Sequence, residues 1–135
     1  MKRLYLFTIL FVLSCSICSA NLFSSEAIHQ AEQFSSLIDN GDYQAAYQSS
    51  SVLLHISLSE QEWNIERDRT EKLLGRVLER KLVSIKSRDS YPGLPDGNYL
   101  IVYYEAKTER KSKAAEVLLL SRYANRWEVC GYKMR

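Results

Sequence analysis

Apolar residues recur every three or four positions in the first part of the chain, which predicts helices there. The first predicted helix covers residues 24–39. Asn40-Gly41 ends it, because glycine adopts the left-handed conformation freely. Asp42 caps a second predicted helix over residues 43–54. The short connection requires the two helices to pack as an antiparallel hairpin. Residues 54–58 alternate in polarity, and the local pattern leaves helix and extended chain open there.

A third helix is predicted to begin at Ser59, because Ser59 and Glu62 have the spacing of a capping box. It continues to Leu74, and Gly75 weakens it near its end. Its polar side carries charges of both signs, which is typical of a solvated helix face. The charged residues of this side are Glu62, Glu66, Arg67, Arg69 and Lys72.

The apolar period changes to two after this helix, which predicts strands. The predicted strands cover residues 80–88, 99–104, 115–121 and 126–134, and residues 92–97 have the Pro-Gly composition of a turn. Three helices followed by four strands predict an α+β domain. We expect a curved four-stranded antiparallel meander packed against the helices.

The first 20 residues have the three-part layout of a secretory signal peptide. A basic start (Lys2, Arg3) precedes an apolar run over residues 4–13, and small residues lead to a cleavage site after Ala20. Ten apolar residues are too few to span a membrane, which takes about 20. Cleavage leaves residues 21–135 as a single domain without a predicted transmembrane span.

A second interpretation of the same segment is a lipoprotein signal that ends at residue 14. Val12-Leu13-Ser14-Cys15 resembles the bacterial lipoprotein box, in which Cys15 becomes the lipidated first residue. The prediction is therefore an exported protein, either free in the periplasm or medium or anchored by lipid to the bacterial membrane.

Charge and cysteine content exclude some classes of function. Lys and Arg number 18 against 16 Asp and Glu, and removal of Lys2 and Arg3 leaves them equal, so no nucleic-acid partner is expected. Two His and three Cys make a metal site improbable, and no cofactor motif is found. Simple cleavage leaves Cys130 alone, and we expect a buried thiol that acts as a small apolar side chain.

Two segments carry a resemblance to a known family. They are the turn Pro92-Gly93-Leu94-Pro95-Asp96-Gly97 and the ending Arg126-Trp127-Glu128-Val129-Cys130-Gly131-Tyr132-Lys133-Met134-Arg135, and Glu116 opens the strand between them. Over residues 27–135 the chain resembles the secreted bacterial domain-of-unknown-function family number four thousand and nineteen. It has Leu73 where the family pattern has proline.

The resemblance implies a cone-shaped fold similar to nuclear transport factor 2 and the cystatins. In that fold a curved sheet wraps a long helix and leaves a pocket at the wide end. The wider superfamily includes isomerases, dehydratases and non-catalytic dimerisation modules, so a second copy of the chain is one partner to consider.

Glu116 is the candidate for catalysis in this sequence. Strand alternation puts it on the same face as Leu118 and Leu120, and a carboxylate there needs a partner, for which Arg80 is suited. In one hypothesis the two form a structural ion pair. In the other, Glu116 is the general base of a small isomerase or lyase.

Aromatic strand residues are the candidates for a ligand pocket. Tyr99, Tyr103 and Trp127 could line an apolar pocket, or they could be core packing. No second catalytic group converges with Glu116 in the sequence pattern. We therefore expect a non-catalytic module that binds a protein or a small apolar ligand, with the enzyme as the alternative.

Overall fold

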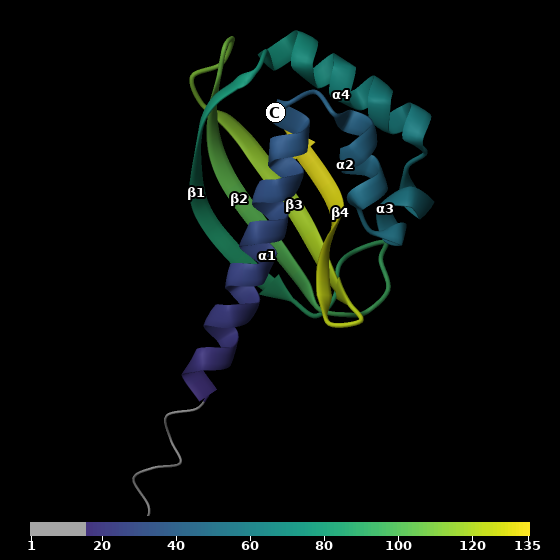
Figure 1. Cartoon of the computed structure of the whole chain (residues 1–135), viewed down its shortest axis with the longest axis vertical. Helices are drawn as coiled ribbons and strands as arrows, with labels where there is room; N and C mark the ends of the chain where they lie inside the picture. Colours follow the sequence, from purple (N-terminus) through teal and green to yellow (C-terminus); the bar gives the residue numbers. More distant parts are fainter. Residues whose placement is uncertain (1–15) are drawn as a thin grey trace, which may run out of the picture.

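Four helices precede four strands in residues 16–135, the part of the chain that the computed structural model describes (Figure 1). The helices are α1 (Ser16–Asp39), α2 (Tyr43–Ser49), α3 (Val52–Ser57) and α4 (Glu60–Leu74). The strands are β1 (Val77–Arg88), β2 (Tyr99–Thr108), β3 (Ala114–Tyr123) and β4 (Arg126–Met134). The predicted α+β class is confirmed.

The strands form one antiparallel sheet in the order β1-β2-β3-β4, which is the predicted meander. α1 lies obliquely across one face of the sheet, and α2 and α3 lie beside it near β4 (Figure 1). We call the face that packs against the helices the inner face, and the opposite face the outer face.

The main core lies between the inner face and the helices. Ala27 and Ala31 of α1 are fully buried, and their small side chains let the helix approach the sheet closely. Strand residues Val102, Leu118 and Leu120 are also fully buried opposite them. Trp127 belongs to this core with 5% exposure, so of the two alternatives for this residue the structure has core packing.

Local capping signals in the sequence are present as predicted. The Ser59 hydroxyl accepts from the Glu62 amide at 3.3 Å, and the Glu62 carboxylate accepts from the Ser59 amide at 2.9 Å, so the capping box opens α4. Gly41 has φ +74° directly after α1, the left-handed conformation expected at that helix end.

The prediction of one helix over residues 43–54 is wrong. The Ser51 amide donates to the carbonyl of Val129 in β4 at 2.8 Å, which ties the chain to the sheet and interrupts the helix. The Ser51 side chain then caps α3 by accepting from the Leu53 amide at 3.2 Å. Residues 52–57 are therefore helical, and the described part of the chain has four helices where three were expected.

α1 begins at Ser16, eight residues before the predicted start at residue 24. Its first core residue is Ala27. The basic start, the apolar run and Cys15 lie outside the described residues. No helix in residues 16–135 is both long and apolar enough to cross a membrane.

Candidate functional site

Glu116 and Arg80 form a buried ion pair on the inner face. Glu116 is fully buried in β3, and Arg80 of β1 donates to its carboxylate through Nε and, at 3.0 Å, through Nη2. β2 lies between the two strands, where Ala106 is paired with Arg80. Because Ala106 is small, the arginine side chain can extend over β2 to reach the carboxylate.

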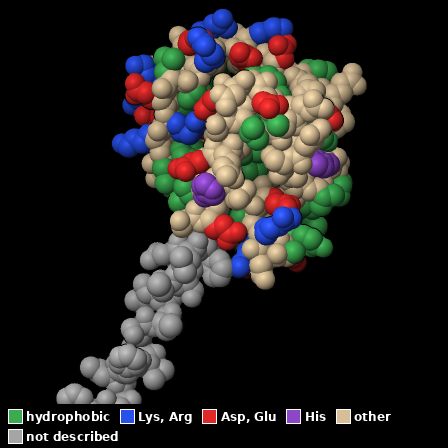
Figure 2. Space-filling view, viewed as in Figure 1, with side chains coloured by type: hydrophobic (Ala, Val, Ile, Leu, Met, Phe, Trp, Pro, Cys, Tyr) green, Lys and Arg blue, Asp and Glu red, His purple; other side chains and the backbone are tan. Residues whose placement is uncertain are grey.

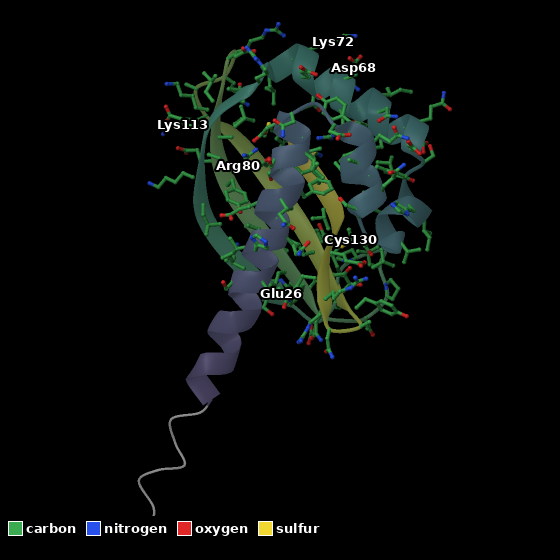
Figure 3. The ribbon with its side chains drawn as sticks, in the orientation of Figure 1. Glu26, Asp68, Lys72, Arg80, Lys113 and Cys130 are labelled. Atoms are coloured by element: carbon green, nitrogen blue, oxygen red, sulfur yellow. The ribbon has the colours of Figure 1, made fainter. Side chains whose placement is uncertain are left out.

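Two further residues complete what we call the Arg80 cluster: Asp39, Arg80, Glu116 and Tyr132. Asp39, the last residue of α1, accepts from Nη1 and Nη2 of Arg80 at 2.9 and 3.0 Å. Tyr132 of β4 donates its hydroxyl to Oε1 of Glu116 at 2.8 Å. Figure 3 shows Arg80 beside the C-terminal half of α1. The cluster thus links α1 to three strands.

The electrostatics of the cluster keep its donors protonated. Burial opposes the charge of Arg80, but its hydrogen bonds with Asp39 and Glu116 raise its pKa above the usual value. Burial, followed by the charge of Glu116, raises the pKa of Tyr132 well above its ordinary value. Three donated hydrogen bonds therefore occupy the Glu116 carboxylate, an arrangement that favours the structural ion pair.

The three aromatic pocket candidates do not come together. Tyr99 and Tyr103 lie on the outer face, where Tyr99 packs with Leu119, whereas Trp127 lies in the inner core. β2 is apolar on both faces, so its sequence pattern does not indicate which face the helices cover.

The outer face carries an open groove, which α3 borders through its last residue, Ser57. The groove has a volume of about 600 Å³, and its lining includes Tyr91, Leu94, Tyr103, Val117, Leu119 and Lys133. The segment before β2 folds onto this face, since the Tyr99 hydroxyl donates to the carbonyl of Pro95. We call this feature the outer groove.

Two lysines lie at the outer groove: Lys133 belongs to its lining, and Lys86 lies next to it through a contact with the lining residue Tyr103. Lys86 lies over the ring of Tyr103, with Nζ 5.2 Å from the ring centroid. Lys133 pairs across the strands with Val117. Neither lysine forms an ion pair with a described residue. The turn composition of residues 92–97 indicated a loop but not its position over the sheet, so sequence reasoning missed this groove.

Cys130 lies beside the outer groove in β4 (Figure 3). It is 4% exposed, which confirms the expected burial, and burial raises the pKa of its thiol to about 11. No group of three or more His, Cys, Asp or Glu in residues 16–135 is arranged to hold a metal ion.

Charged side chains of both signs are interspersed on the helix-covered side of the molecule, most densely in the upper part of the view (Figure 2). Several are paired locally, as in the 2.7 Å ion pair between Lys72 and Asp68 on α4. This side offers a mixed surface, in contrast to the unpaired lysines of the outer groove.

Fold and site together define an α+β domain with a four-stranded meander, a buried ion-pair cluster on one face and an open groove on the other. The family described as "Protein of unknown function (DUF4019)" matches residues 30–132, and the chain belongs to this family. No curated protein and no solved structure matches the chain.

Proposed function

We propose that the protein is an exported, non-catalytic binding module that holds an extended segment of a partner protein in the outer groove. The observation that carries the proposal is this groove, an open hollow of about 600 Å³ on the sheet face opposite α1, lined mainly by apolar residues. An exposed groove of this kind suits an extended chain, whereas small-molecule sites are usually more enclosed.

The chemistry of the groove defines the partner segment. Tyr103, Val117 and Leu94 offer apolar contacts, and Lys86 and Lys133 have no acidic partner among the described residues. A segment that alternates apolar with acidic residues would satisfy both features, because successive side chains of an extended chain point to opposite sides.

The Arg80 cluster supports a binding module over an isomerase or lyase. A general base must have a lone pair available to a substrate proton, and the carboxylate of Glu116 is buried and already accepts from Arg80 and Tyr132. We further propose that the sheet and α1 correspond to the cone of nuclear transport factor 2 and the cystatins.

Selection of displayed random peptides on the exported protein tests the proposal. We expect enrichment of peptides that combine acidic and apolar residues, with binding weakened at least about tenfold by Lys86→Glu or Lys133→Glu. Lys111→Glu and Lys113→Glu in the exposed turn between β2 and β3 are matched controls and should leave the affinity unchanged.

Three results would contradict the groove proposal. One is equal weakening by the control variants, which would indicate a general charge effect. The second is a small apolar molecule that copurifies in the groove. The third is self-association of the protein that Lys86→Glu abolishes, because a second copy would then be the occupant.

Export is tested by intact-mass measurement after expression of the full chain in a bacterium. We expect loss of the first 20 residues, or of the first 14 with a diacylglyceryl mass on Cys15. Either cleavage leaves the core intact, because its first residue is Ala27. A protein that retains Met1 and stays in the cytoplasm would refute export.

A further inference from the structure

Arg67 of α4 is a buried cation without a hydrogen-bond acceptor in the described part of the chain. Its side chain is only 6% exposed, and its Nε has no hydrogen-bond partner. Its guanidinium carbon lies 4.7 Å from the ring centroid of Trp63 and 4.5 Å from that of Tyr132. The two rings hold the guanidinium in place but leave its N–H donors unused.

A buried guanidinium without acceptors is unfavourable, because the ring contacts replace only part of the lost hydration. Burial accordingly lowers the pKa of Arg67, although the surrounding tyrosines and carboxylates oppose the effect. Buried donors in folded proteins are nearly always satisfied by protein, water or ligand. Arg67 therefore calls for an oxygen acceptor that comes from outside the chain.

Arg67 lines a cavity of about 50 Å³. The lining residues come from the end of α1, from α4 and from the end of β4, and these elements meet in the upper part of Figure 1. A water needs roughly 10–15 Å³ on this measure, so the cavity of about 50 Å³ has room for about three to five non-hydrogen atoms, and propionate has five. Ile38, Val77 and Met134 contribute apolar walls. We call this space the Arg67 cavity.

The acidic residues that line the Arg67 cavity are engaged with other donors. Glu71 accepts from the Tyr43 hydroxyl at 2.6 Å, and Asp39 accepts from Arg80 at 2.9 Å. Arg76, the other arginine in the lining, is 73% exposed and pairs with Glu109 at 3.1 Å. Arg67 is thus the buried cation in this lining whose donors remain available.

We propose that the Arg67 cavity binds the carboxylate of a short-chain monocarboxylic acid. A guanidinium presents two parallel N–H donors that match a carboxylate, and the aromatic rings hold this fork in one orientation before the ligand arrives. The short alkyl group would contact the apolar walls. A single negative charge fits best, because Asp39 and Glu71 would repel a dianion such as phosphate.

This site does not depend on the proposed function, because the Arg67 cavity lies on the helix side of the sheet and its lining shares Tyr132 alone with that of the outer groove. Failure of one of the two proposals therefore does not imply failure of the other. A protein that binds no peptide can still bind a carboxylate at Arg67.

Titration of the ¹⁵N-labelled protein with propionate at constant ionic strength tests the site without any substitution. We expect a saturable shift of the Arg67 Nε–H resonance and of amides in α4. Propionamide has the same shape without the charge, and inorganic phosphate has too much charge, so neither should reproduce the saturable shift. No saturable shift with propionate, or an equal one with propionamide, would overturn the proposal and leave water as the occupant.

Two arginine variants separate this site from general attraction of anions. Arg67→Gln should weaken propionate binding at least about tenfold, whereas Arg69→Gln, at an exposed position of α4 outside the cavity lining, should change it less than about threefold. Equal weakening by both variants would contradict a specific site. If Arg67→Gln does not fold, Arg67→Lys is the alternative variant. It keeps the positive charge but loses the two parallel N–H donors of the guanidinium, and we expect it to weaken binding as well.

Discussion

Substitution of Arg80 by alanine should lower the free energy of unfolding by about 3–5 kcal/mol, because it leaves the fully buried carboxylate of Glu116 without its cation. Asp39 would lose its partner at the same time, so the end of α1 would be less firmly held to the sheet. Chemical denaturation monitored by tryptophan fluorescence measures the change.

Arg76→Ala is the matched control, since Arg76 forms an exposed ion pair with Glu109 at 3.1 Å. It should leave the denaturation midpoint nearly unchanged.

Glu116→Gln should destabilise the protein at pH 7, by about 1–3 kcal/mol, because the amide accepts fewer hydrogen bonds from Arg80 and Tyr132. A Glu116→Gln variant more stable than the wild type would favour the general-base hypothesis and contradict the structural pair.

Elements with strong local signals were predictable from the sequence. The capping box at Ser59 opens α4, Gly41 follows the end of α1, and β4 has the predicted bounds 126–134. The break between α2 and α3 was not predictable, because it depends on a hydrogen bond from Ser51 to Val129, which is 78 positions later in the sequence. Local periodicity contains no information about such a contact.

The ion pair of the candidate site was predictable in part. Alternation along β3 indicated an inward Glu116, and the need of a buried carboxylate for a cation pointed to Arg80 as its partner. Asp39 and Tyr132 come from a helix end and a distant strand, and tertiary packing alone brings them to the pair. The same limit applies to Arg67, which the sequence pattern assigned to the charged, solvated side of its helix but which is buried between Trp63 and Tyr132.

The aromatic residues predicted to line one pocket lie on opposite faces of the sheet. Tyr103 and Trp127 both belong to apolar strand patterns, but α1 covers only one face. The Pro-Gly segment before β2 partly covers the other face and leaves the outer groove open. A domain of this size can bury a helix-covered core and still keep a second apolar surface for a partner.

Trp127→Ala is expected to lower the free energy of unfolding by about 3–5 kcal/mol, the usual cost of truncating a large core aromatic residue. Trp127 is 5% exposed and packs in the main core, and its Nε1 has no hydrogen-bond partner in the described part of the chain. The loss is therefore one of packing and of the cation–π contact with Arg122, whose guanidinium carbon lies 6.0 Å from the ring centroid. Tyr123→Ala in the same hairpin is the control, because Tyr123 is 76% exposed and its removal should change stability by no more than about 0.5 kcal/mol. Urea denaturation of the two variants measures the difference. A loss below about 1 kcal/mol for Trp127→Ala would contradict the register of β4, since a shift of one residue would move this side chain to the outer face.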